Sequence, residues 1–564
     1  MEVEQINQDI LKLLPADAKL IIEFGCGSGA TGARYKLINP RCFYIGIESN
    51  PELANLAKQK LDKVAIAKRC GCNIAPLQDN SNLLDIEPGT VDCLVYGSTL
   101  AEISNPLSVL TYHKTWLKDD GQILAIIPNV QHWRRILNLI KGEWENPDNI
   151  DRWFTLNSLK SLFAEALLQV YEIQTKGKKG EEFQRFRQLI EPLANTLHLS
   201  PGNFATQTAA EYYIVRATKS SLPPRRLLIQ TIIMAPTGCD RVRVLEPDRL
   251  SATIPGIRTI SAVKSADLSA PLPAEEKVFI WQRTIMTYPT HIQQLKNLLQ
   301  RGYLIVAEID DNPLRRREYA DNNYLSYRGC HCVQTSTEPL ADFLRQYNPN
   351  VAVFTNHLAY LPPPRNYDKN ETITIFFGAL NREQDWEPIM PAINKLLSEY
   401  GEKIRFKIIH DRLFYDSLNT TNKQFEPFCN YEKYKEILYT CDIGLLPLND
   451  NPVNQMKSDL KFVECAGSGA AVLASPTVYQ GSIVEGETGL IYRSVGEFEA
   501  KLKELIENTN LRRRIAVNAY NWVGENRLLC QHYRQRRDWY LEMRDRLPSL
   551  NEELRSRVPE LFTD

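Results

Sequence analysis

The stretch LIIEFGCGSGATGARYKLINPRCFYIGIE, residues 20–48, decides how the first part of the chain folds. Its apolar start ends in Glu23 and leads at once into a loop with glycines at positions 25, 27, 29 and 32. A second apolar run, residues 43–47, ends in another acid, Glu48. This order predicts a strand, a glycine-rich turn, a helix and a second strand, with a carboxylate at the tip of each strand. Such a unit suits a nucleoside ligand whose ribose hydroxyls contact Glu48.

The composition is that of a soluble protein with several domains. Its 564 residues are too many for one core, which predicts two to four domains. The formal net charge of -1 gives no sign of a nucleic-acid partner. No apolar run approaches the roughly 18 residues of a membrane span. The acidic start, MEVEQINQDI, is unlike a signal peptide, so we expect a cytoplasmic protein.

The cysteines are interpreted as structural. Several of the 12 lie inside apolar runs, where a thiol behaves as a small hydrophobic group. Two clusters, Cys70-Gly71-Cys72 and Cys330-His331-Cys332, lack the two-residue spacer of a zinc half-site, and no matching second pair follows. We therefore expect no metal and a reducing compartment.

The glycine loop has two interpretations. Residues 27–32 satisfy the dinucleotide pattern G-x-G-x-x-G, and Glu48 lies near the expected distance beyond it. However, Glu23 would stand close to the pyrophosphate of a dinucleotide and repel it. The same carboxylate suits the ammonium of an amino-acid tail. S-adenosylmethionine has that tail and no phosphate, so the pattern favours this ligand over a nicotinamide dinucleotide.

The sequence beyond the loop continues this α/β pattern. Residues 91–96 form a buried strand with Ser98 just past its tip, and a helix is expected from Asn105 to Trp116. A turn at 119–121 then leads into a strand at 122–127. Alternation of this kind predicts a parallel sheet with helices on both faces and a ligand site at the carboxyl ends of the strands.

These residues resemble a class I S-adenosylmethionine-dependent methyltransferase over about residues 18–175. The motifs that carry the resemblance are EFGCGSG (23–29), GIESNP (46–51), GTVDCLVYGSTLAEISNP (89–106) and LKDDGQILAIIPN (117–129). The resemblance implies that the glycines face the methionine part of the cofactor, Glu48 the ribose and Asn73 the adenine amine. The cofactor-binding residues implied by position are Glu23, Gly25, Cys26, Gly27, Gly29, Glu48, Asn73 and Ser98.

Two departures from the family concern the adenine contact and the catalytic base. Asn73 stands where many relatives have Asp, and Ala101-Glu102 stands where they often have Glu-His. Positioning can carry much of methyl transfer, but a base helps when the acceptor is a sugar hydroxyl. Glu102, His113 and His132 are the candidates, and the simpler interpretation of His113 is a solvated helix residue.

The domain boundaries follow from linker composition and from a second α/β series. We place a first domain at 1–220 and a linker at 221–225, inside the proline-containing stretch KSSLPPRR. New apolar strands follow, one of them ending in Asp310-Asp311, and Pro362-Pro363-Pro364 makes a stiff break. The second half then reads as two sheets, residues 226–364 and 365–564, with a ligand site in the cleft between them.

The most informative part of the second half is residues 441–475. A strand there is followed by a polar loop with Lys457 and by a predicted helix with Lys461 and Glu464. Cations at a loop-to-helix junction suit a diphosphate, and a carboxylate one turn along suits ribose hydroxyls. A lysine and a glutamate at this spacing are more often a surface pair.

This half resembles the GT-B glycosyltransferases, especially the family 4-like group used in bacterial polysaccharide assembly. The resemblance rests on KSDLKFVE (457–464), AGSGAAVLAS (466–475), EGETGLIY (485–492) and FFGALN (376–381). It implies that Glu464 binds the ribose of a nucleotide-sugar donor, Lys457 or Lys461 its diphosphate, and that Gly378 lets backbone approach the donor. Met456 replaces the first of two glutamates found in many relatives.

Two further expectations concern the acceptor and the membrane. Asp310 and Asp311 end a strand beside the expected cleft and are candidates for acceptor contact or for a helix cap. Residues 511–544 are predicted to form a helix that returns to the first sheet of this half. Its arginines are expected to be solvated, or to meet anionic lipid at the inner face of the membrane.

The sequence thus predicts an α/β protein, a Rossmann-like methyltransferase sheet followed by a GT-B pair of Rossmann-like domains. The functional hypothesis is a two-headed transferase that uses S-adenosylmethionine and a nucleotide sugar on a saccharide or glycolipid acceptor, without nucleic acid. One alternative is a glycosyltransferase with a non-catalytic methyltransferase-like module. An oxidoreductase first domain and a non-enzymatic scaffold are the others.

Overall fold

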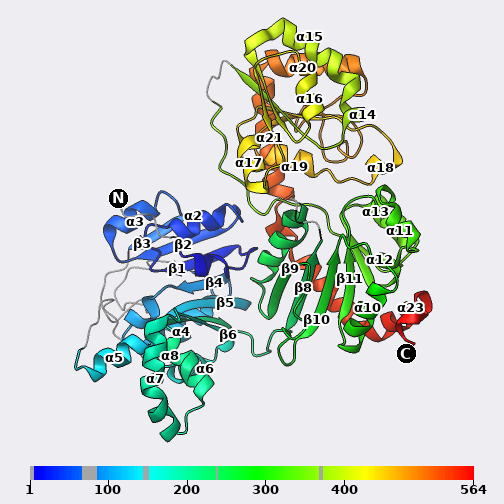
Figure 1. Ribbon diagram of the computed structural model, residues 1–564. Coiled ribbons are helices and arrows are strands. Elements are labelled where there is room, and N and C mark those ends of the chain that lie inside the picture. Colours follow the sequence, from blue (N-terminus) through cyan, green and yellow to red (C-terminus); the bar gives the residue numbers. More distant parts are fainter. Residues whose placement is uncertain are drawn as a thin grey trace. The chain divides into compact units, whose positions relative to one another are not determined.

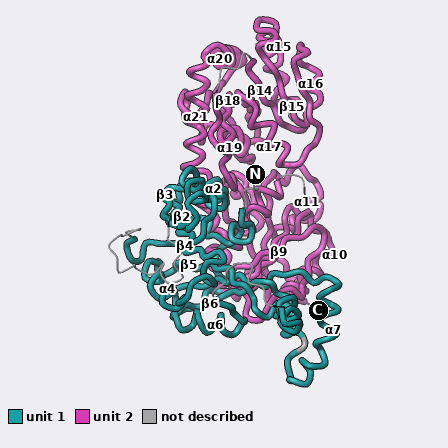
Figure 2. The backbone as a smooth tube through the Cα atoms, turned by 90° about the vertical axis from the view of Figure 1, so that its left-hand side faces the viewer, with its two compact units in different colours: residues 1–225, 253–256 teal, residues 226–252, 257–564 magenta. Residues whose placement is uncertain are grey.

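The computed structural model describes residues 6–66, 86–143, 152–234, 236, 239–367 and 372–563. The chain forms two compact units (Figure 2). Unit 1 comprises Met1–Arg225 and Thr253–Gly256, and unit 2 comprises Arg226–Ala252 and Ile257–Asp564. Within the described ranges, no helix combines the length and the apolar character needed to cross a bilayer.

The described part of unit 1 contains one seven-stranded sheet in the order β3-β2-β1-β4-β5-β7-β6 (Figure 1). The strands are β1 (Leu20–Phe24), β2 (Phe43–Glu48), β3 (Lys63–Ile66), β4 (Val91–Tyr96), β5 (Leu117–Pro128), β6 (Gln169–Lys176) and β7 (Tyr212–Thr218). Strands β1 to β5 pair in parallel, and β7 is antiparallel to both of its neighbours. The strand order reverses between β1 and β4, and a reversal point is where such sheets bind ligands.

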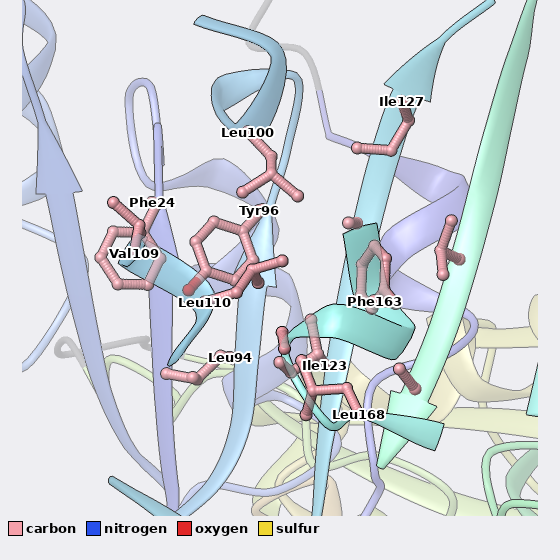
Figure 3. Packing of buried hydrophobic residues seen from close by; sticks show 14 of the residues in the cluster. Phe24, Leu94, Tyr96, Leu100, Val109, Leu110, Ile123, Ile127, Phe163 and Leu168 are labelled. Atoms are coloured by element: carbon pink, nitrogen blue, oxygen red, sulfur yellow. The ribbon is translucent and has the colours of Figure 1, made fainter. Parts of the chain in front are cut away.

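Helices cover both faces of this sheet. They are α1 (Gln8–Leu11), α2 (Ala30–Lys36), α3 (Pro51–Ala57), α4 (Pro106–His113), α5 (Trp133–Ile140), α6 (Leu156–Glu165), α7 (Glu181–Thr196) and α8 (Pro201–Ala209). One core packs Tyr44 and Cys93 against α1, α2 and α3. The other packs Phe24 and Tyr96 with residues of α4 and α6, including Leu110 and Phe163 (Figure 3).

Two parts of this sheet differ from the sequence-based prediction. β5 begins at Leu117 and runs through the turn predicted at 119–121, because Leu117 pairs with Val91 of β4 and a register shift between Val91 and Cys93 accommodates the residues before Gln122. β6 was not predicted as a strand. It is a half-buried edge strand and lacks the continuous apolar run of the central strands.

The first sheet of unit 2 has the order β13-β12-β11-β10-β8-β9 among the described residues. Its strands are β8 (Leu227–Ile233), β9 (Ile257–Val263), β10 (Glu276–Gln282), β11 (Leu304–Glu308), β12 (Cys332–Thr335) and β13 (Val351–Val353). All of these pairings are parallel. Strand β9 was not predicted, because it lies at the edge and is only half-buried.

The second sheet of unit 2 has the order β16-β15-β14-β17-β18-β19 in the described chain. Its strands are β14 (Ile373–Gly378), β15 (Ile404–Ile409), β16 (Lys423–Glu426), β17 (Ile443–Leu446), β18 (Ala471–Ala474) and β19 (Leu490–Ile491). Every pairing is parallel, and the order reverses between β14 and β17. The three sheets confirm the predicted fold class.

The helices of unit 2 pack on both of its sheets. They are α9 (Glu246–Ser251), α10 (Thr290–Gln300), α11 (Arg317–Asp321), α12 (Leu325–Arg328), α13 (Glu338–Arg345), α14 (Glu383–Trp386), α15 (Met390–Tyr400), α16 (Arg412–Ser417), α17 (Tyr431–Tyr439), α18 (Pro452–Gln455), α19 (Leu460–Gly467), α20 (Val495–Glu507), α21 (Thr509–Asn526), α22 (Arg534–Asp545) and α23 (Leu547–Arg557).

The single helix predicted over 511–544 is wrong, since α21 ends at Asn526 and α22 starts at Arg534. Between them Leu528 bridges to Leu358, so the two segments that connect the sheets of unit 2 run side by side. The expected solvated arginine face is also wrong at two of the arginines. Arg536 is 7% exposed and donates to the carbonyl of Arg243, and Arg544 donates to that of Gly302.

Candidate functional site

The glycine loop of unit 1 follows β1 at the point where the strand order reverses. Gly25 and Gly27 have φ angles of 74° and 56°, which other residues rarely adopt. A Cβ atom on Gly25 would lie 2.5 Å from Oγ1 of Thr99, a residue that follows β4 and donates to the carbonyl of Phe24. A Cβ atom on Gly27 would meet nothing within 4 Å. The loop is therefore closely packed at Gly25 and open to a ligand at Gly27.

Glu48, the last residue of β2, holds this loop through its carboxylate. Oε2 accepts a hydrogen bond from the Gly27 amide at 2.8 Å, and Oε1 accepts from the amides of Ser49 and Asn50 at 2.8 and 2.9 Å. A carboxylate oxygen can accept two hydrogen bonds. Oε2 therefore keeps acceptor capacity for a ribose hydroxyl beside the open side of the loop. The residues present fit the predicted nucleoside contact.

Glu23 is buried beneath the loop, and it is not exposed at the strand tip. It is 5% exposed, and its carboxylate accepts a hydrogen bond from the Tyr44 hydroxyl at 2.9 Å. Burial raises its pKa to about 7, the Tyr44 hydroxyl opposes that rise, and the charge of Glu48 adds to it. An ammonium group nearby would favour the ionised form, so the residue is compatible with the predicted amino-acid tail.

Glu23 should make the stability of unit 1 depend on pH. Its pKa of about 7 exceeds the ordinary 4.5, so the folded state binds the proton more tightly. Its contribution is complete below pH 4.5 and is lost as pH rises through 7, a decrease of about 3 kcal/mol in the free energy of unfolding.

Glu23→Gln should remove this decrease. Urea unfolding of the whole chain in acid and at about pH 8 measures it; Glu52→Gln, at an exposed position, is the control. The same pH dependence in Glu23→Gln and wild type would contradict the assignment.

His113 lies in the core of unit 1, so its interpretation as a solvated helix residue is wrong. It is fully buried, and its Nδ1 lies 2.8 Å from the Tyr96 hydroxyl. Its ring stacks on Phe24 and on Trp116, with centroid distances of 4.7 and 4.3 Å. The end of α4 turns this side chain inward against β1 and β4. It is therefore not available as a base for an acceptor.

The other predicted residues of unit 1 have different surroundings. Ser98 donates to the Glu102 carboxylate at 3.2 Å, and both side chains are accessible just beyond β4. His132 is 8% exposed, and burial lowers its pKa. Cys26 is also buried, which raises the pKa of its thiol to about 12. Asn73 lies outside the described residues.

In unit 2, cations gather at the carboxyl end of β14 and the start of α19. Lys461, in the first turn of α19, donates to the carbonyl of Gly378, the last residue of β14. Arg382 lies four residues beyond Gly378 and donates to Asp385 and Asn454 at 2.9 and 3.1 Å. This cluster lies where the strand order of the second sheet reverses.

Burial and the charge of Arg382 both act on the pKa of Lys457 and of Lys461. Burial and then the charge of Arg382 lower the pKa of Lys457, while Asp311 opposes the effect. Burial also lowers the pKa of Lys461; Glu464 opposes this change and Arg382 adds to it. Both lysines are thus partly desolvated cations, which interact more strongly with an anion than solvated ones do.

Glu464 lies one turn along α19 and lines a cavity of about 310 Å³. Its two oxygens accept hydrogen bonds from the hydroxyls of Tyr431 and Tyr434, each at 2.9 Å. Burial raises its pKa, whereas Lys461 and the two hydroxyls oppose the rise. The carboxylate is held in place by α17 and borders an open space, as a ribose contact requires.

The two acids at the end of β11 have different accessibility. Asp310 pairs with Arg283, and its side chain is 9% exposed. Asp311 is 31% exposed and lies 3.3 Å from Lys457 Nζ and 3.4 Å from Arg315. Burial alone would raise the pKa of Asp311, but Lys457, Arg283 and Arg315 hold it below its ordinary value. Asp311 is the acid that a bound molecule can reach.

Gly378 has a packing role that the sequence did not indicate. A Cβ atom there would lie 2.6 Å from the Phe376 ring and 3.5 Å from that of Tyr434. The glycine is needed for these rings, so the space beside it is not open to a donor. Its carbonyl still contributes to the site by accepting from Lys461.

The Cys330-His331-Cys332 cluster is structural. His331 is fully buried, its Nδ1 accepts from the Ile305 amide at 2.9 Å, and its Nε2 lies 3.0 Å from Asn551 Oδ1. In the part of the chain that the structure describes, no three His, Cys, Asp or Glu side chains are grouped as they would be to hold a metal ion. The cluster at Cys70 and Cys72 lies outside the described residues.

Part of unit 2, beginning after β14 and ending within α22, matches a family model. Residues 387–542 match the family model described as "Glycosyl transferase-like". They form a glycosyl transferase-like domain. This domain contains Lys457, Lys461 and Glu464, and Gly378 and Arg382 precede it by a few residues.

Solved structures resemble parts of the chain at low sequence identity. TarM is 10% identical over 47% of this chain and 54% of its own, with a TM-score of 0.37. A sucrose-phosphate synthase from Thermosynechococcus elongatus is 12% identical over 56% and 99%, with a TM-score of 0.42. A SAM-dependent methyltransferase from Thermotoga maritima is 17% identical over 37% and 88%, with a TM-score of 0.25. The chain spans about half the length of TarM. No curated protein matches it.

Sequence reasoning missed three residues around the glycosyl transferase-like domain. Arg382 follows FFGALN directly and could have been found as the nearest cation after β14. Tyr431 and Tyr434 have no local signal, because they reach Glu464 from 33 and 30 residues away.

Proposed function

We propose that unit 2 transfers a sugar from a nucleotide-sugar donor to a saccharide or glycolipid acceptor. The observation that supports this best is the arrangement around α19: Arg382, Lys457 and Lys461 at its start, and Glu464 one turn along. The spacing suits a diphosphate followed by a ribose. The Asp459 side chain does not cap α19, because it pairs with Arg527, and the Asp459 carbonyl accepts from the amides of Phe462 and Val463. The amides of Leu460 and Lys461, in the first turn, would then contact phosphate oxygens.

The chemistry would depend on stabilising the leaving diphosphate. Its negative charge grows as the bond to the sugar breaks, and fixed cations in a partly desolvated site stabilise that charge. Asp311 lies beside Lys457, so a hydroxyl held by Asp311 would be next to the diphosphate. Either Asp311 or the departing phosphate could then take the hydroxyl proton.

For unit 1 we propose binding of S-adenosylmethionine and methyl transfer. The cofactor would supply the methyl group; Glu48 would hold its ribose and Glu23 would stabilise its ammonium group. Support comes from the open backbone at Gly27 and the remaining acceptor capacity of Glu48. Glu102 would remain as the accessible candidate base. Both units could act on one growing bacterial surface glycan, with the methyl group decorating it.

The second candidate is a glycosyltransferase whose unit 1 binds the cofactor without transferring the methyl group. Its support is the burial of His113, which leaves fewer candidate bases near the loop. Methylated product forms only if unit 1 transfers the methyl group, so an assay of methyl transfer distinguishes the two candidate functions of unit 1.

A donor screen tests both proposals. The chain would be incubated with radiolabelled S-adenosylmethionine and with a panel of nucleotide sugars, and hydrolysis and transfer would be measured separately.

Glu464→Ala should abolish most sugar release. Glu48→Ala should weaken S-adenosylmethionine binding about 10- to 100-fold by calorimetry, because a charged hydrogen bond is lost. Glu52→Ala, at an exposed position on α3, should leave binding unchanged. Release of no sugar from any donor would contradict the proposal for unit 2, and absence of S-adenosylmethionine binding would contradict both proposals for unit 1.

A further inference from the structure

The ends of α5 and α7 in unit 1 expose a group of large apolar side chains. Leu189 and Leu193 of α7 are 76% and 54% exposed, and Leu197, just past the helix, is 59% exposed. Residues four apart lie on one side of a helix, so these leucines form a stripe. Leu139 and Ile140, at the end of α5, are 49% and 65% exposed. The three leucines on one side of α7 form a contiguous apolar patch, and such a patch marks a contact surface, whereas single apolar side chains do not.

The stripe continues from an apolar groove between the two helices. α5 and α7 pack through Trp133 and Phe186, whose ring centroids lie 6.2 Å apart. A groove of about 400 Å³ between them is lined by these rings, by Leu137 and Leu189, and by Arg134 and Arg185. Glu182 also lines the groove and pairs with Arg134 at 3.0 Å, so the surface combines an apolar centre with the guanidinium group of Arg185 and a paired Arg134 beside it.

The charge of this surface limits what it can contact. Residues 133–143 and 178–199 hold seven Lys and Arg and four Glu, a net charge of +3 in a chain whose net charge is -1. Lys141, Lys178 and Lys179 are exposed. In a two-fold contact with a second copy, this basic surface would face itself, which like charges disfavour. The complementary surface is anionic.

We propose that the face formed by α5, α7 and residues 197–199 docks on a membrane surface rich in anionic lipid headgroups. The leucines enter the boundary between headgroups and acyl chains, and the basic side chains contact headgroup phosphates. This surface differs from the arginine-rich helix α22, whose Arg536 and Arg544 donate to backbone carbonyls of unit 2.

Vesicle flotation of the full chain tests the proposal. One set of vesicles contains phosphatidylcholine alone, and the other contains phosphatidylcholine mixed with phosphatidylglycerol. We expect binding to the mixed vesicles that decreases with salt, and about a tenfold or greater loss in the double variants Leu189→Gln/Leu193→Gln and Lys178→Glu/Lys179→Glu. Leu413→Gln, which removes a 56% exposed leucine from α16 of unit 2, should bind like wild type.

Circular dichroism of each variant establishes that it is folded before binding is compared. Absence of binding by the wild type, equal binding to both vesicle types, or full binding by the leucine variant would overturn the proposal. So would light scattering that shows a dimer which the leucine variant converts to a monomer, since the stripe would then be an interface between copies. Loss of binding in both double variants, with Leu413→Gln unaffected, would support it.

Discussion

Lys461→Met should reduce the rate of sugar release from the donor about 10²- to 10³-fold, the cost of removing one fixed group that stabilises developing charge. Methionine keeps most of the side-chain volume and loses the ammonium. Lys461 is the cation anchored at the end of β14 by the Gly378 carbonyl, so its position is set by the second sheet. The effect should appear mainly in the catalytic rate, because the charge on the diphosphate increases as the bond breaks.

Steady-state kinetics with the best donor from the screen measure this effect. Lys433→Met removes an exposed lysine from α17 and should leave the rate unchanged. A thermal melt separates loss of chemistry from loss of folding. A fully active, folded Lys461→Met variant would mean that the diphosphate is bound elsewhere.

Arg243→Met should destabilise unit 2 by about 3 to 5 kcal/mol, the cost of leaving a buried charge without its partner. Arg243 and Glu308 are each 1% exposed, and Nε donates to the Glu308 carboxylate at 2.7 Å. Nη1 also donates to the Phe354 carbonyl and to Asn356 Oδ1. The substitution therefore removes donors from three acceptors that water cannot reach.

A double-mutant cycle tests whether the pair is responsible. Arg243→Met/Glu308→Met should be less destabilised than Arg243→Met, because no buried charge is then left unpaired. Arg317→Met, which removes a pair with Asp321 whose side chains are 89% and 54% exposed, should change stability little. Urea unfolding is measured for the wild type, for Arg243→Met, Glu308→Met and their double variant, and for the Arg317→Met control. Equal destabilisation of the single and double variants would show that Arg243 acts through its contacts with Phe354 and Asn356 alone.

The sequence predicted several inner strands from continuous apolar runs, and it missed the edge strands β6 and β9 and the inner strand β15, in which Arg405 and Lys407 interrupt the apolar run. Leu227–Ile233 and Ile373–Gly378 are continuous apolar runs because both faces of a central parallel strand are buried. Gln169–Lys176 and Ile257–Val263 lie at or near sheet edges, and their mixed composition gives no such run. A strand is thus easier to recognise from its apolar run when both of its faces are buried than when one face is exposed.

Some residues of the candidate sites could be predicted from the local sequence, and others could not. Lys461, Glu464 and Glu48 follow strands or begin helices, so local pattern placed them at the carboxyl edges of sheets. Burial of His113 could not be predicted, because it depends on the rings of β1 and β4. Likewise, the burial of Arg536 depends on a carbonyl 293 positions away in the chain. Contacts between residues so far apart in the chain cannot be predicted from a short stretch of sequence.

The return of the chain to the first sheet of unit 2 constrains how this unit can form during synthesis. Tyr540 donates a hydrogen bond to Gln334, 206 positions earlier, and Leu554 and Val558 belong to the same core as Phe279 and Ile305. The second sheet can fold from a continuous stretch, whereas the first must wait for helices translated long after its own strands. A ribosome paused before α22 would hold that sheet with part of its apolar core open to chaperones.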